Sequence, residues 1–144
     1  MGTRSCIAVD HGGVIKAVYC HYDGYLENNG KILYENYPSE RANYLVSLGD
    51  LSTLGKDTDP DPLRGDHSFK TPQRGVCVFY GRDRKEKGVE FNTLESVQEM
   101  FDVYCHCEYF YLMRDGQWLV SKGYEFEPLK DALIEAEILQ VANY

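Results

Sequence analysis

The amino-acid sequence predicts an α+β fold in which a mainly antiparallel sheet of hairpins carries two to four short helices on one face. Three observations lead to this prediction. Short β-rich runs occur in pairs around turn residues, amphipathic segments lie between these pairs, and the 144 residues match the size of one domain. Because hairpins separate the helices, the strands that they join are antiparallel.

Turn and capping residues delimit the elements of the first half of the chain. Asp10-His11-Gly12-Gly13 is typical of a hairpin turn, and Pro38 is expected to stop a short helix. Ser39 can cap the next helix, which Gly49 is expected to end. The expected elements are strands at 5–9 and 14–22, a helix at 31–37 and a second helix between Ser39 and Gly49.

Residues 55–75 are the least regular part of the sequence. They contain three of the five prolines, with Asp57, Asp59, Asp61 and Asp66 between them. A loop of this length inside a compact domain is usually functional or disordered. The chain is therefore expected to be a single domain, 1–144, that contains a Pro/Asp-rich loop at about 55–75.

Similar signals delimit the elements of the second half. The charged run 81–88 is typical of a hairpin tip, and Asn92-Thr93-Leu94-Glu95 has the spacing of a capping box. Arg114-Asp115-Gly116 indicates another hairpin turn, and Pro128 suits the first position of a helix. The expected elements are strands at 76–80 and 89–91, a helix from 92 to about 101, strands at 103–113 and 117–121, and a last helix from Glu127.

Acidic residues are concentrated towards the C-terminus. The net charge is −8; residues 1–87 carry 12 acidic and 12 basic side chains, whereas residues 88–144 carry 11 acidic and 3 basic ones. Such a charge repels a phosphate backbone, so direct nucleic-acid binding is not expected. It suits either solvated helix faces or a surface that binds a basic groove of another protein. The residues expected to bind such a partner are Glu90, Glu95, Glu99, Asp102, Glu127, Asp131, Glu135 and Glu137.

A short Tyr-Cys-His repeat suggests an alternative site. Val18-Tyr19-Cys20-His21 is echoed by 103–106, and a carboxylate follows each copy, at Asp23 and at Glu108. If both copies are paired strands, two imidazoles and two carboxylates converge in a metal or acid–base site; otherwise the cysteines face the core and the other side chains face solvent. The alternative ligand-binding residues are Tyr19, His21, Asp23, Tyr25 and His106.

Known catalytic and metal-binding motifs are not found. The sequence has no G-x-S-x-G, no Walker loop, no H-E-x-x-H and no C-x2-C pair, so no catalytic residue, metal or cofactor is assigned. The odd number of cysteines, five, is typical of reduced thiols inside a cell. No apolar run approaches the roughly 20 residues that span a bilayer, and the N-terminus has no signal core. A cytoplasmic protein without membrane contact is expected.

Several segments of the first 55 residues form a recognisable pattern. They are GTRS at 2–5, YCHYDGY at 19–25, NGKIL at 29–33, ENY at 35–37 and LGDLSTLG at 48–55. With this pattern the chain resembles a family of small, mostly uncharacterised bacteriophage and prophage proteins, for which no catalytic residues are assigned. The resemblance implies a setting in which small acidic proteins often inhibit host defence. Some are anti-CRISPR proteins that occupy nucleic-acid grooves, and others sequester nucleotide signals.

Three functions follow from these observations, in order of preference. The first is a phage-encoded inhibitor of a bacterial defence system, specifically an anti-CRISPR protein, that binds a host defence protein such as a Cas effector through its acidic surface in the host cytoplasm. The second is a small-molecule binding module such as a nucleotide-signal sponge, in which Arg4 and Lys31 meet the phosphates. The third is a small enzyme that uses His21, His106 and nearby carboxylates. The sequence assigns no oligomeric state.

Overall fold

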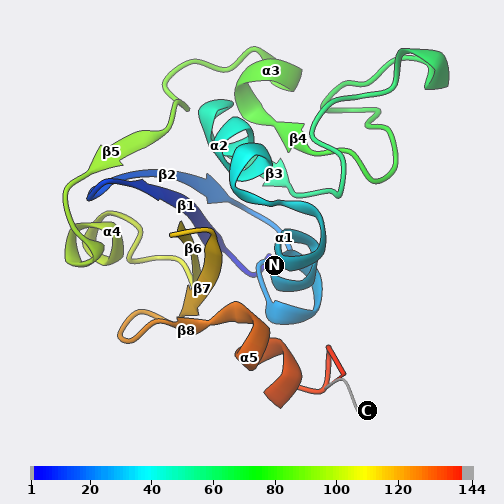
Figure 1. Cartoon of the computed structure of the whole chain (residues 1–144). Coiled ribbons are helices and arrows are strands. Elements are labelled where there is room, and N and C mark those ends of the chain that lie inside the picture. Colours follow the sequence, from blue (N-terminus) through cyan, green and yellow to red (C-terminus); the bar gives the residue numbers. More distant parts are fainter. Residues whose placement is uncertain (1, 141–144) are drawn as a thin grey trace.

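A curved eight-stranded sheet forms the centre of the computed structural model, which describes residues 2–140 (Figure 1). The strand order is β4-β3-β2-β1-β6-β7-β8, and β5 pairs with β2 beside this path. Most pairs are antiparallel, whereas β1 with β6 and β2 with β3 are parallel. The predicted α+β class with a mainly antiparallel sheet is confirmed.

The elements have the following bounds. The strands are β1 Ser5–His11, β2 Val14–Cys20, β3 Leu51–Thr53, β4 Val78–Phe79, β5 Asn92–Leu94, β6 Tyr109–Arg114, β7 Gln117–Ser121 and β8 Glu127–Pro128. The helices are α1 Lys31–Asn36, α2 Ser39–Ser47, α3 Tyr80–Arg84, α4 Val97–Val103 and α5 Leu129–Glu135. A π-helical turn, η1, occupies Leu26–Gly30 and a 3₁₀ turn, η2, occupies Pro62–Arg64.

The two hairpins with the clearest turn signals form as predicted. Strands β1 and β2 pair along their full length, and the turn between them holds Gly12 and Gly13 at φ 59° and 93°. The β6–β7 turn holds Asp115 and Gly116 at φ 53° and 77°. Two successive residues with positive φ are what the type I′ turn of a two-residue hairpin loop requires.

Helices cover both faces of the sheet, which corrects the prediction of one covered face. Ile7 and Val9 pack into a core with residues of α1, α2 and α5, whereas Cys6 and Ala8 pack with residues of α4 and β5. Alternate residues of a strand point to opposite faces, so β1 needs a covering layer on each side. The continuous buried run from Ser5 to Val9 is the sequence counterpart of this arrangement.

The prediction of a hairpin tip at residues 81–88 is wrong. Residues 80–84 form α3, and the following strand, β5, pairs with β2 rather than with β4. The Asp83 carboxylate accepts a hydrogen bond from the Phe79 backbone N–H at 2.7 Å, which stabilises the start of the helix. Lys85, in the left-handed conformation at φ 57°, ends it.

Three predicted helix starts also shift. Ser96, not Asn92, caps α4: its hydroxyl accepts a hydrogen bond from the Glu99 N–H at 3.1 Å, whereas Asn92 lies in β5 because that segment completes the edge of β2. Ser39 is the first residue of α2, and Pro38 occupies the cap position. Glu127 and Pro128 pair with β7, so α5 begins at Leu129.

Candidate functional site

A row of exposed carboxylates extends from β8 along α5. Glu127, Asp131 and Glu135 follow one another at intervals of four residues, which places Asp131 and Glu135 one turn apart on the same side of the helix. All three side chains are exposed, as is Glu137 just beyond the helix. None of the four forms an ion pair with another residue in the range 2–140. Like charges at this spacing weaken a helix slightly, so the row offers binding capacity rather than stability.

Tyr124 lies next to this row, and the sequence analysis did not single it out. Its side chain is 77% exposed. It borders a hollow of about 240 Å³ whose wall also includes Glu125, Glu127, Ala132 and one basic residue, Lys122. The Ser121 hydroxyl accepts hydrogen bonds from the N–H groups of Gly123 and Tyr124, which holds the turn that presents the ring. We call Tyr124, Glu125, Glu127, Asp131, Glu135 and Glu137 the acidic surface.

The other four acidic residues that were predicted to bind a partner lie apart from the acidic surface. Glu90, Glu95 and Asp102 are exposed near β5 and α4. Glu99 is partly buried, and its carboxylate accepts a hydrogen bond from the Glu95 N–H at 3.2 Å. Since α4 and α5 pack on opposite faces of the sheet, the eight predicted residues form two patches rather than one.

Basic residues of α3 do not neutralise either patch. Arg82 pairs with Asp83 at 2.9 Å and with Asp59 at 3.3 Å. Arg84 pairs with Glu86 at 2.6 Å. These contacts stay within α3, the residue Glu86 that follows it closely and the Pro/Asp-rich loop, so α3 contributes no ion pair to the acidic surface within residues 2–140.

The second Tyr-Cys-His copy is not a strand, and this prediction is wrong. Val103 ends α4, and residues 104–108 form a turn before β6. The Ser96 cap starts the helix, and Tyr104 then fills the core under the sheet, where its hydroxyl donates to the Ala17 carbonyl at 3.0 Å. The face alternation expected for this segment therefore does not apply.

His106 nevertheless lies close to the first Tyr-Cys-His copy. Its ring lies 5.2 Å from the ring of Tyr19, and the Tyr19 hydroxyl lies 2.6 Å from His21 Nδ1. Asp23 instead accepts a hydrogen bond from the Tyr25 hydroxyl at 3.2 Å. Three of the five alternative ligand-binding residues thus meet, and the other two form a separate pair. Within residues 2–140, no three side chains of the types His, Cys, Asp and Glu are arranged to hold a metal ion.

The buried cysteines do not provide an activated nucleophile. Burial raises the pKa of Cys20 and Cys107 to about 12, and it also raises the pKa of Cys6 and of Cys77. Nucleophilic attack needs the thiolate, which these thiols do not populate near neutral pH. Cys105 is exposed.

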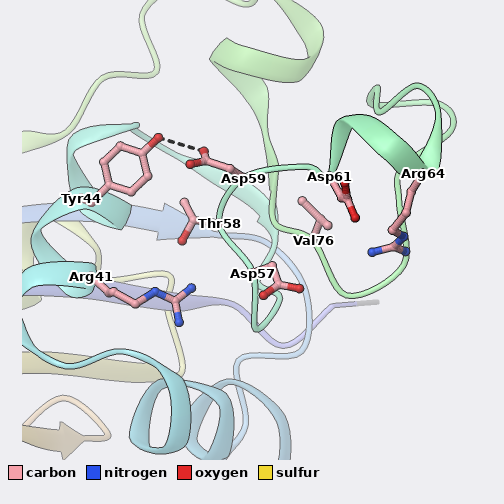
Figure 2. A pocket seen from close by; sticks show the side chains of 8 residues that line it. All are labelled: Arg41, Tyr44, Asp57, Thr58, Asp59, Asp61, Arg64 and Val76. Atoms are coloured by element: carbon pink, nitrogen blue, oxygen red, sulfur yellow. Dashed lines mark hydrogen bonds between the residues drawn. The ribbon is translucent and has the colours of Figure 1, made fainter.

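Figure 2 shows a basin of about 430 Å³ that the Pro/Asp-rich loop forms against α2. In this view the Arg41 and Arg64 guanidinium groups flank Asp57. Asp59 accepts a hydrogen bond from the Tyr44 hydroxyl at 2.8 Å. Arg41 donates to two backbone carbonyls, those of residues 36 and 56. Because most of its charged groups bond to backbone groups or to neighbouring side chains, the basin stabilises the loop more clearly than it offers a ligand site.

Gln73 holds the loop together from inside. It is buried, its amide nitrogen donates to the carbonyls of Asp61 and Gly65, and its amide oxygen accepts from the Asp61 N–H. Its own backbone N–H donates to His67 Nδ1 at 2.9 Å, and His67 Nε2 lies 3.3 Å from the Asp83 carboxylate. The loop is therefore tied to α3.

Comparison of the chain with protein-family models, with curated proteins and with solved structures finds no match. None of the helices described for residues 2–140 combines the length and apolar character needed to cross a bilayer.

Proposed function

We propose that this protein is a phage-encoded inhibitor of a bacterial defence system that acts by binding a basic protein surface. The observation that carries the proposal is the acidic surface: an exposed tyrosine beside a hollow, bordered by carboxylates without intramolecular ion pairs in the described chain. Tyrosine is enriched among the residues that contribute most to protein–protein binding, and a polar rim commonly surrounds such residues.

The class of partner follows from charge and from the resemblance of the first 55 residues to phage proteins. A negative surface is attracted to a groove lined by arginine and lysine, and grooves of that kind normally hold nucleic acid. A Cas effector has such a groove, which makes an anti-CRISPR protein the specific form of the proposal. Its site of action would be the cytoplasm of the infected host.

A phage-plating assay in a host with active CRISPR–Cas immunity tests the proposal. Expression of the wild-type chain is expected to raise plating of a targeted phage, and the triple variant Glu127→Lys, Asp131→Lys, Glu135→Lys is expected to lose this effect. Tyr124→Ala should reduce it. Glu35→Lys, a reversal at an exposed position on α1, is the matched control and should behave as wild type.

Affinity capture with the same variants tests the binding step. The wild-type chain is expected to retain a defence protein that a polyanion such as heparin displaces, with binding that weakens as salt is raised. Equal retention by the wild type and the triple variant would contradict the role of the acidic surface. Reversal of Glu90, Glu95 and Asp102 instead shows whether the α4 patch contributes.

A further inference from the structure

Phe69, Tyr80 and Arg84 form a stack of planar groups that the acidic surface does not include. The Phe69 and Tyr80 rings lie 5.6 Å apart, and the Arg84 guanidinium lies 4.4 Å from the centre of the Phe69 ring and 5.1 Å from that of Tyr80. The adjoining hollow of about 440 Å³ is lined by Ser68, Phe69, Lys70, Asp83 and Arg84. A hollow of this size beside planar groups suits a flat ring.

The wall of this hollow carries the basic side chains of Lys70 and Arg84, although the chain as a whole is acidic. Lys70 lies in its wall, and Lys85 and Lys87 follow Arg84 along the chain. All three lysine side chains are exposed. They belong to the part of the chain that carries no net charge, so this basic region is a local feature.

The acidic side chains beside the hollow are already paired. The Asp83 side chain is buried, and its carboxylate accepts a hydrogen bond from the Phe79 N–H and pairs with Arg82. Glu86 pairs with Arg84, whose side chain is still 48% exposed. Lys70 forms no ion pair within residues 2–140, so it is the lining charge that remains available to a ligand, and it favours an anionic group.

The stack is held in place before any ligand arrives. The Phe69 N–H donates to the Asp83 carbonyl at 3.2 Å, and the Thr71 N–H donates to the Ser68 hydroxyl at 3.0 Å. His67, two residues before Phe69, is tied to the Asp83 carboxylate. A prearranged site loses less free energy on ordering when it binds.

We propose that this stack binds a nucleotide, with the base on Arg84 and Phe69 and the phosphate on Lys70. Bases stack on aromatic rings and on arginine in the same way in many nucleic-acid sites. A base with its phosphate occurs both in free nucleotides and in single strands. The net charge of −8 repels a long strand, so the free nucleotide is the expected source.

Titration of the ¹⁵N-labelled protein with three probes tests this inference. AMP is expected to shift the amide signals of residues 68–70 and 84 with a dissociation constant below about 1 mM. Inorganic phosphate alone should bind more weakly, because it lacks the base. If a five-nucleotide oligodeoxythymidylate binds and AMP does not, base stacking at this site is supported, but the ligand is a single strand and not a free nucleotide.

Two variants and a control separate stacking from charge. Phe69→Leu keeps an apolar side chain but removes the aromatic face, and should weaken AMP binding about five- to a hundred-fold. Lys70→Glu should weaken it and reduce its salt dependence, whereas Lys130→Glu at an exposed position on α5 should change neither. If Phe69→Leu does not fold, Lys70→Glu at an exposed position still provides the test. Absence of AMP and oligonucleotide binding up to about 5 mM, or shifts that map elsewhere, would overturn the inference.

Discussion

Replacement of Gln73 by methionine should loosen the Pro/Asp-rich loop without unfolding the core. The change removes three side-chain hydrogen bonds to Asp61 and Gly65. Each bond contributes about 0.5–1.5 kcal/mol net, but both partner residues are exposed, so water replaces part of the loss and about 1–3 kcal/mol remains. The equilibrium constant for local opening of the loop should therefore rise about five- to a hundred-fold.

Limited trypsin digestion measures this opening, because Arg64 lies in the segment that Gln73 holds. Cleavage after Arg64 should accelerate by the predicted factor in Gln73→Met, and hydrogen exchange at the Asp61 amide should accelerate with it. Gln98→Met makes the same replacement at an exposed position on α4 and serves as the control. Unchanged cleavage would refute the role of Gln73. If the free energy of global unfolding falls by as much as the free energy of local opening, the loop and the core unfold together.

Two further predictions concern titratable groups. Burial raises the pKa of Asp50 from 3.8 to about 6, so the folded chain binds this proton more tightly than the unfolded chain and its ionisation costs stability as pH rises from about 4 to 6. Asp50→Asn should therefore be more stable than wild type in urea at pH 7, with a smaller difference below pH 4; an equal difference at both pH values would contradict this. Iodoacetamide at pH 7.5 should label Cys105 first in the native protein and all five cysteines only in urea. Rapid native labelling of Cys20, seen by mass spectrometry, would show that its burial is wrong.

Local signals predicted the elements whose stability is decided within a few residues. The Gly12-Gly13 turn and the Asp115-Gly116 turn identify both long hairpins, because positive φ angles limit the residues that can occupy them. The Pro38 stop likewise placed the end of α1 correctly.

Competition between similar local signals explains the errors. Asn92-Thr93-Leu94-Glu95 and Ser96-Val97-Gln98-Glu99 have the same capping spacing, and the pairing of residues 92–94 with β2 decides between them. The charged run 81–88 has the composition of a hairpin tip, but its first residues are helical in the structure, where the Phe79 N–H donates a hydrogen bond to the Asp83 carboxylate. In both cases a contact made by the folded chain overrides the pattern.

Composition and spacing alone were enough to indicate the α+β class, the excess of negative charge after residue 87 and the positions of most strands along the chain. They could not show that Tyr124 and Glu127 line the same hollow. Nor could they show that the His106 ring lies beside Tyr19 or that the Arg84 guanidinium lies over the Phe69 ring. The last two contacts join residues that are distant in the chain, and closing such separations is favourable only when a common core forms. Packing on both faces of β1 and β2 creates that core, and it therefore decides which side chains become neighbours at the surface.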